Sequence, residues 1–298
     1  ERGDAGDYRA VRCFRGVLRL LYGALHCLGR DRRRRPGAVR DIQAAQPPDL
    51  PAFFRPVYLD SVTSTNDEMK QKARAGAPEG SLIVAREQRT GRGRGGRQWT
   101  SPPGNLYMSL LLRPQGNVGT VAQISFLAAV ALAEALTAIA PQLSPRLKWP
   151  NDVLVNGKKA SGILLESNAE PGGSDVDWLI VGIGINIDHF PDDTPYPATS
   201  INAERADSTR ATTVEDALSQ LVAAFDRWYQ VWLEQGFSTI RLAWKEKARG
   251  IGEDIIVRLE KQELSGIFAD IDHQGALILR HEAGDQLITA GDIFFPAS

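Results

Sequence analysis

Thiol and imidazole side chains are scarce in this chain. Its 298 residues include only two cysteines, Cys13 and Cys27, and four histidines. The cysteines do not form a C-x-x-C pair, and neither they nor the histidines have the spacing of a zinc site. The sequence therefore excludes thiol catalysis beyond Cys27 and a histidine metal centre, and it indicates a reducing compartment such as the cytoplasm.

The chain also lacks an excess of charge of either sign. It has 35 Lys and Arg residues against 36 Asp and Glu, so its net charge is −1, which gives no reason to expect a nucleic-acid or membrane partner. The apolar stretch at residues 17–29 is interrupted by Arg19 and His26 and is shorter than the roughly 18 residues that cross a bilayer. A targeting peptide remains an alternative there, although no small-residue cleavage site follows. We predict a cytoplasmic protein.

The composition that is present, 43% hydrophobic and 24% charged, is typical of a globular protein with one large and one small domain. Residues 1–54 contain the basic run GRDRRRRPGAVRD and the spacer QPPDLP, which predict a poorly structured leader and linker. The basic run has the charge to bind nucleic acid, but no helix-turn-helix pattern accompanies it. Residues 55–248 predict the large domain and residues 249–298 a small β-barrel of five short strands.

Strand and helix signals alternate through the large domain. After a first strand, Thr65 and Glu68 have the T-x-x-E spacing of a helix capping box, and Gly76 is placed to stop that helix. Asn156 and Gly157 predict the two-residue turn of a β-hairpin. This mixture predicts an α+β domain whose mixed sheet is flanked by helices. Further helices are predicted over residues 121–140, 214–234 and 238–248.

The stretch QRTGRGRGGRQW at residues 88–99 holds four glycines and four arginines. Gly91, Gly93 and Gly96 satisfy the G-x-G-x-x-G dinucleotide pattern, but the Pro-Pro and Gly that follow prevent the helix that would hold a pyrophosphate. The chain has no P-loop pattern. An RNA-binding RGG segment is a further alternative, although such segments normally lie in long low-complexity tracts.

The remaining interpretation is a mobile loop that folds over an anion. Arginines offer paired donors to carboxylate or phosphate, and glycines let the backbone approach closely. The arginines in question are Arg92, Arg94 and Arg97.

Five motifs then occur in a characteristic order. They are STN at residues 64–66, GRGRGGRQW at 91–99, KWPND at 148–152, SGILLE at 161–166 and GIGIN at 182–186. In order and spacing they resemble the motifs of biotin protein ligases, and the resemblance extends from about residue 57 to the C-terminus. It implies a class II synthetase-like catalytic domain followed by an SH3-like barrel.

The resemblance also implies a two-step reaction. Biotin and Mg·ATP give biotinyl-5′-adenylate and pyrophosphate, and a lysine of a biotin carboxyl carrier protein domain, as in acetyl-CoA carboxylase, then attacks the adenylate to form an amide. No tightly bound prosthetic group is expected. Two alternatives remain open: a lipoate or octanoate ligase or transferase of the same superfamily, and a bifunctional ligase that also represses a biotin operon. We expect no DNA binding, and a homodimer stays open.

Site residues follow from the resemblance. The ureido end of biotin is expected to contact Ser64, Thr65, Asn66 and Gln88, with helix capping as the alternative for the first two. Arg92, Gly93 and Arg94 match the loop that closes over the ligand in the family, although Gly95 stands where relatives often carry another arginine. Arg92, Arg94 and Lys148 are the expected catalytic cations, because biotin's carboxylate must approach a phosphate.

Lys148 is the main catalytic candidate, and it is also expected to contact both biotin and the nucleotide. Gly162 is expected to let the backbone approach biotin, and Gly184 to do the same for the ligand. Trp99 is either a stacking wall for adenine or a core residue. Asp152 is a candidate for holding Mg²⁺, with hairpin capping as the alternative. The full set of expected nucleotide contacts is Arg94, Arg97, Trp99, Lys148, Asn151 and Asn186.

Overall fold

The computed structural model describes residues 48–168, 175–205 and 210–296. Most of the predicted leader, residues 1–47, lies outside this part of the chain. The predicted domain boundaries near residues 55 and 249 stay a proposal, because no independent observation tests them.

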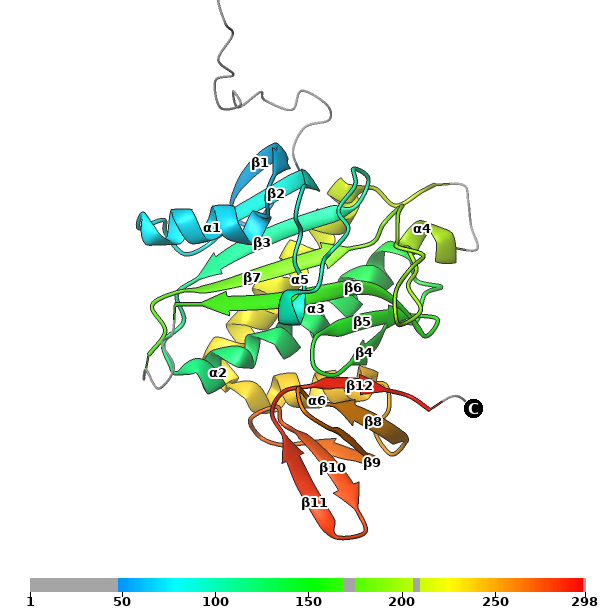
Figure 1. Cartoon of the computed structure of the whole chain (residues 1–298). Coiled ribbons are helices and arrows are strands. Elements are labelled where there is room, and N and C mark those ends of the chain that lie inside the picture. The colour runs from blue at the N-terminus through cyan, green and yellow to red at the C-terminus, as the bar shows by residue number, and fades with distance from the viewer. Residues whose placement is uncertain (1–47, 169–174, 206–209, 297–298) are drawn as a thin grey trace, which may run out of the picture. The chain divides into compact units, whose positions relative to one another are not determined.

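A seven-stranded sheet with the order β1-β2-β3-β7-β6-β5-β4 carries the larger part of the fold (Figure 1). β1 and β2 pair in parallel and all other neighbours are antiparallel, so the predicted mixed sheet is confirmed. β3 and β7 lie at its centre and are almost entirely apolar, as expected for strands covered on both faces. The strands are β1 (Arg55–Val62), β2 (Ser81–Gln88), β3 (Leu106–Leu112), β4 (Arg146–Lys148), β5 (Asp152–Val155), β6 (Lys158–Ser167) and β7 (Leu179–Ile185).

Helices cover the two faces of this sheet unequally (Figure 1). On one face α1 (Thr65–Arg74) buries Met69 and Ala73 against Ile83, Leu111 and Ile180. On the other face α3 (Ile124–Ile139) and α5 (Val214–Gln235) form the main core. Because α1 is short, it leaves part of this face of the sheet uncovered, and the site described below lies there. The remaining helices are α2 (Val118–Ala122), α4 (Ile201–Glu204), α6 (Phe237–Lys247) and the 3₁₀ turn η1 (Arg94–Gly96).

The most apolar helical stretch, residues 118–139, has a mean hydropathy of 1.8 and is long enough to cross a membrane. Its larger part, α3, is instead packed between the sheet and α5, and eleven of its sixteen residues are buried. This confirms the buried helix predicted from the sequence.

Five strands after α6 form a second, antiparallel sheet with the order β11-β10-β9-β8-β12. It confirms the five strands predicted for the C-terminal region. The Trp149 indole N–H donates to the Gly275 carbonyl over 3.0 Å, and Arg241 Nε donates to the Ile271 carbonyl over 2.7 Å. These hydrogen bonds join the turn after β4 and helix α6 to the C-terminal region. The strands are β8 (Asp254–Arg258), β9 (Glu263–Ile271), β10 (Leu277–His281), β11 (Gly284–Ile288) and β12 (Asp292–Phe294).

The start of α1 differs from the sequence prediction. Its N-cap residue is Ser64, whose side chain makes no capping bond, so a capping box at Thr65 and Glu68 is wrong. The hydroxyl of Thr65 is directed elsewhere, because it donates to Gln88 Oε1 at 3.1 Å. The helix end at Gly76, with a positive φ of 82°, agrees with the prediction.

The predicted hairpin between β5 and β6 is confirmed. Asn156 and Gly157 have φ values of 50° and 77°, the left-handed pair that a tight hairpin turn requires. Side-chain hydrogen bonds to Glu204, the last residue of α4, connect this turn to the chain around α4. Glu204 accepts hydrogen bonds from Thr199 Oγ1 and Asn156 Nδ2, both at 2.6 Å, and from Lys158 Nζ at 3.0 Å.

These bonds predict a pH dependence of stability. The hydroxyl of Thr199, with Asn156 and Lys158, lowers the pKa of Glu204 from 4.5 to about 2. The carboxylate therefore stabilises the fold fully above about pH 4.5, and this contribution is lost as the pH falls toward 2. With solvent screening, Glu204→Gln should lower the free energy of unfolding at pH 7 by about 1–2 kcal/mol.

Urea unfolding of the wild type and Glu204→Gln between pH 7 and 3 measures this difference. It should shrink on acidification, and a difference independent of pH would contradict the assignment. The matched control is Glu263→Gln, which removes the carboxylate of an exposed ion pair between Glu263 and Arg258.

Candidate active site

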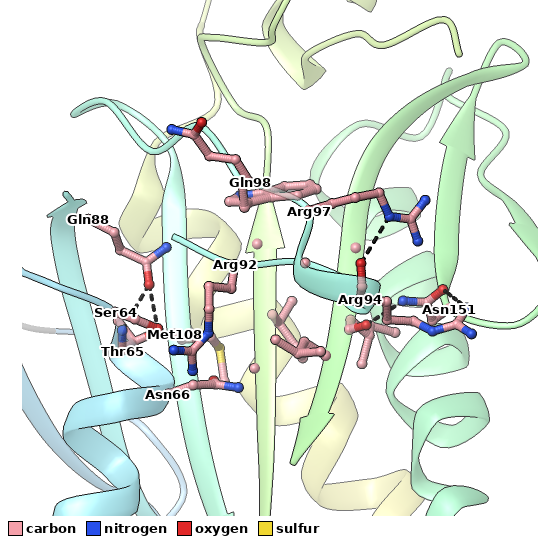
Figure 2. Close-up of a pocket in the computed structure, with 18 of the residues that line it drawn as sticks. Ser64, Thr65, Asn66, Gln88, Arg92, Arg94, Arg97, Gln98, Met108 and Asn151 are labelled. Carbon is pink, nitrogen blue, oxygen red and sulfur yellow. Dashed lines mark hydrogen bonds between the residues drawn. The ribbon is translucent and has the colours of Figure 1, made fainter. Parts of the chain in front are cut away.

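One pocket on the α1 face of the large sheet brings together most of the residues singled out in the sequence (Figure 2). Its floor is formed by β3, β6 and β7, and its roof by the loop at residues 91–99, called the arginine loop below. The expected residues that line it are Ser64, Thr65, Asn66, Gln88, Arg92, Gly93, Arg94, Arg97, Trp99, Asn151 and Gly162.

The end of the pocket next to α1 is a rigid polar cluster. Gln88 Oε1 accepts from both the backbone N–H and the hydroxyl of Thr65, at 2.8 and 3.1 Å, and its Nε2 donates to Ser101 Oγ at 2.9 Å. Beneath them Ser109 Oγ lies 2.8 Å from Thr65 Oγ1 and 2.5 Å from Asn66 Oδ1. Because Thr65, Asn66 and Ser109 are almost fully buried, these groups keep fixed directions and suit a small polar group with several hydrogen bonds.

Two glycines of β7 let side chains lie directly on the sheet. A Cβ atom at Gly182 would lie 2.3 Å from Asn66 Oδ1, and one at Gly184 would lie 2.5 Å from Trp99 Nε1. The Trp99 indole therefore rests on Gly184 and on its neighbour Gly162 across the strand pair. In this structure the group that approaches Gly162 and Gly184 is Trp99, and the approach of a ligand to these two glycines stays a prediction.

Cations gather at the other end of the pocket. Arg94 Nη1 donates to Asn151 Oδ1 at 3.2 Å and to the Gly291 carbonyl at 3.3 Å, while burial lowers the pKa of its guanidinium. Arg97 Nη2 donates to Asp292 Oδ1 at 3.1 Å. Since Gly291 and Asp292 lie at the start of β12, the second sheet holds one end of the arginine loop.

Lys159 is the lysine in the pocket wall, and sequence analysis missed it. Its ammonium lies 2.6 Å from Asp152 Oδ1 and over the rings of Trp99 and Tyr196, at 5.5 and 5.0 Å from their centroids. Its side chain is 12% exposed. These contacts place a fixed positive charge beside Arg94.

Lys148, the main catalytic candidate from the sequence, does not line this pocket. Its ammonium lies 5.8 Å from the Tyr196 ring and 5.3 Å from the Phe294 ring. Burial lowers its pKa, and the like charges of Lys159 and Arg97 act in the same direction. Lys148 pairs with Asp152, which pairs with Gly162, so Lys148 belongs to the pocket face of the sheet. Its catalytic role and its contacts with biotin and the nucleotide stay predictions.

A β-bulge explains why Lys159 was missed. Asp152 and Val153 pair with Gly162 and Ser161, but Leu154 pairs with Lys159, so Ala160 is an extra residue in β6. Regular alternation would send Lys159 and Gly162 to opposite faces, whereas one extra residue brings both to the pocket. The only sequence signal was a basic pair, NGKKAS, next to a motif residue.

Two other predicted contacts have partners within the protein. Asp152 is paired with Lys159, and no cluster of three metal-binding side chains occurs within residues 48–168, 175–205 and 210–296. Asn186 is buried, and its Nδ2 donates to the Thr199 carbonyl at 3.0 Å. Its observed role is to hold the chain after β7, and its contact with a nucleotide stays a prediction.

Two carboxylates beside the polar cluster, Asp67 and Glu166, were also missed. Asp67 Oδ2 and Oδ1 accept from Arg92 Nη1 and Nη2 at 2.8 and 2.6 Å. This paired hydrogen bond raises the pKa of Arg92, with Glu166 acting in the same direction. Asp67 directly follows the STN motif and Glu166 ends the SGILLE motif, but neither spacing indicates that both meet the arginine loop.

Comparisons with known proteins identify the family. Residues 58–186 match the Biotin/lipoate A/B protein ligase family, and residues 250–295 match the Biotin protein ligase C terminal domain. A biotin--[acetyl-CoA-carboxylase] ligase of Paracoccus denitrificans is 44% identical over 240 residues, which cover 80% of this chain and 99% of that protein. The chain belongs to the biotin protein ligase family. A Bifunctional ligase/repressor BirA of Bacillus subtilis is 36% identical, with 80% of this chain and 73% of that protein covered.

A solved structure of the same family has the same fold. The biotin protein ligase from Aquifex aeolicus, in complex with biotin and ATP, superposes with a TM-score of 0.69 and 28% identity, covering 82% of this chain and 99% of that one. The predicted α+β catalytic fold followed by an SH3-like C-terminal fold is thus confirmed for this family member.

Proposed function

We propose that this protein activates biotin with ATP to biotinyl-5′-adenylate and transfers the biotinyl group to a lysine of a biotin carboxyl carrier protein domain of acetyl-CoA carboxylase. The observation that carries the proposal is one pocket with a fixed polar cluster at one end and clustered cations at the other. Biotin has the matching polarity, with a ureido group at one end and a carboxylate at the other.

The polar cluster favours biotin over the alternatives of lipoate and octanoate. A ureido group has both donors and an acceptor for Ser64, Thr65, Asn66 and Gln88. The tail of octanoate has none, so it offers no hydrogen-bonding partner to this cluster.

The cations serve the first step, in which a biotin carboxylate oxygen attacks the α-phosphate of ATP. The new acid–phosphate bond forms as the bond to pyrophosphate breaks. Two anions must come within bonding distance, so positive charge is needed in a water-poor site. Lys159 and Arg94 supply it from the pocket wall, Lys148 adds to the field from beside them, and Arg97 and Asn151 face the nucleotide. Magnesium enters as part of the ATP complex, with Asp152 as the carboxylate nearest the cations.

In the second step the nucleophile belongs to the partner. The neutral amine of a carrier lysine attacks the biotinyl carbonyl, an amide forms, and AMP leaves. The enzyme needs no covalent intermediate, and the arginine loop shields the reactive anhydride from water. We further propose a cytoplasmic, monofunctional enzyme without DNA binding. The basic leader, the segment considered for DNA binding, is residues 1–54. Both a monomer and a homodimer are compatible with the proposed reaction.

The first test is biotin-dependent exchange of labelled pyrophosphate into ATP by the purified protein, with and without a carrier domain. We expect exchange that needs biotin but no carrier, because adenylate formation is reversible before transfer. Exchange with lipoate or octanoate in place of biotin would assign the protein to the sister activity, and none with any acid would refute adenylation.

Substitutions distinguish the roles of Lys159 and Lys148. Lys159→Ala should lower the exchange rate by about 100-fold, since it removes a charge at the reacting groups. Lys148→Ala should lower it by about tenfold, because Lys148 is not among the side chains that line the pocket and its charge acts from beside them. Both variants should keep the wild-type circular dichroism. The reverse order of the two effects would restore Lys148 as the main catalytic cation.

Asp292 tests the contribution of the second sheet. Asp292→Asn removes the carboxylate that holds Arg97 at 3.1 Å and lies 3.7 Å from Arg94. We expect the KM for ATP to rise about two- to fivefold, the range for a partly exposed ion pair. Initial rates against ATP concentration measure this. Asp285→Asn, on β11 of the same sheet, should have no effect, and an unchanged KM for Asp292→Asn would contradict the assignment.

A further inference from the structure

Four charged side chains form a cluster under the first arginine of the loop. Besides its paired bond to Asp67, Arg92 Nη2 donates to both oxygens of Glu166 at 3.4 Å. Lys70 Nζ donates to Glu166 Oε1 at 2.6 Å and lies 3.7 Å from Asp67 Oδ1. Two positive and two negative charges are thus in mutual contact, and their side chains are only 23–36% exposed.

This cluster gives Arg92 a different role from Arg94. The guanidinium of Arg92 makes a paired hydrogen bond to one carboxylate and reaches a second, whereas Arg94 Nη1 donates to a neutral amide and a carbonyl and lies 3.7 Å from its one carboxylate neighbour, Asp292. A substrate anion at Arg92 would have to compete with Asp67 and Glu166. Figure 2 shows the Arg92 side chain directed from the loop toward Asn66, at the polar end of the pocket.

We propose that Asp67 and Glu166 are positioning residues that hold Arg92 as a latch on the arginine loop, so that Arg92 closes the site instead of neutralising the substrate. The inference rests on the proposed function, because it names what the loop encloses. It assigns to Asp67 and Glu166 control over how long biotin and its adenylate stay bound.

The size of the pocket supports a latch that opens and closes. Its free volume is ≈ 50 Å³, whereas ligand sites usually have about 300 Å³ or more. The arginine loop must therefore move before a substrate enters. Gly93, Gly95 and Gly96 give the loop that freedom, and Gly95 and Gly96 already have positive φ values of 62° and 75°. Each opening has to break the bonds from Arg92 to Asp67 and Glu166.

Glu166 connects the latch to the polar cluster. Its Oε2 accepts from Asn66 Nδ2 at 2.7 Å, and Asn66 Oδ1 in turn lies 2.5 Å from Ser109 Oγ. The same carboxylate therefore orients the amide at the polar end and contacts the loop. A ligand that orders this end favours the arrangement in which Arg92 finds its partners, so binding and closure are coupled.

Single substitutions test the latch through rates. Asp67→Asn and Glu166→Gln should each raise the dissociation rate of biotin by about five- to thirtyfold, since each removes a charge-assisted, half-buried contact. The KM for biotin should rise in parallel, with kcat for pyrophosphate exchange changed less than threefold. Asp285→Asn is the matched control, because it removes the carboxylate of another paired Arg–Asp contact, to Arg280 at 2.8 and 3.1 Å, and it should match the wild type.

A charge exchange distinguishes a latch from a catalytic cation. Arg92→Asp alone should give fast biotin dissociation, because it places like charges together. Adding Asp67→Arg restores an opposite pair and gives Glu166 a cationic partner, so it should recover slow dissociation and most of the exchange activity. If Arg92 instead neutralises the substrate, the double variant stays as inactive as Arg92→Asp, and that result overturns the proposal.

Failure of the latch proposal can be distinguished from failure of the proposed function. A wild-type protein without biotin-dependent exchange would refute the function itself. An active wild type whose Asp67→Asn and Glu166→Gln variants release biotin at the wild-type rate would refute only the latch. Thermal melting of every variant checks that a change in dissociation does not come from unfolding.

Discussion

Crowded positive charge is the constraint on which the site depends. Arg94, Arg97 and Lys159 line one end of the pocket, and Lys148 lies near them. The carboxylates that meet these cations are Asp152 and Asp292. Such crowding opposes folding, and it adds to burial, the main cause, in lowering the pKa of Lys148 and Arg94. An anionic substrate relieves it, so the energy stored in the empty site becomes available for binding ATP and for bringing two anions together.

The second sheet takes part in this arrangement. Asp292 and the Gly291 carbonyl meet the arginines of the loop, and Phe294 packs near the Lys148 ammonium. A small domain that looks peripheral in the sequence thereby supplies both a counter-charge and an apolar wall. Separating it from the catalytic sheet would free the loop at one end and expose Lys148.

Much of the fold and of the pocket followed from local sequence signals. Apolar strands and an Asn-Gly turn report their own surroundings, so the mixed sheet and the hairpin were predictable. Ser64 to Asn66 came instead from the resemblance of their motif to that of a known family. Lys159 was not predictable, because its direction depends on one extra residue in β6 and not on its neighbours. Asp67 and Glu166 were missed for a similar reason. They meet Arg92 across sequence separations of 25 and 74 residues, which no local pattern encodes.

The bulge at Ala160 has a consequence for how this chain tolerates change in length. Inserting one residue between Val153 and Leu154 would give Ala160 a partner, restore regular pairing and turn Lys159 to the face opposite Gly162, away from Asp152. The turn at Asn156 and Gly157 would be unaffected, and every residue with a named role would still be present. Here the number of residues in a strand matters to the chemistry as much as their identity does, and an insertion that keeps every motif intact would still remove a charge from the reaction.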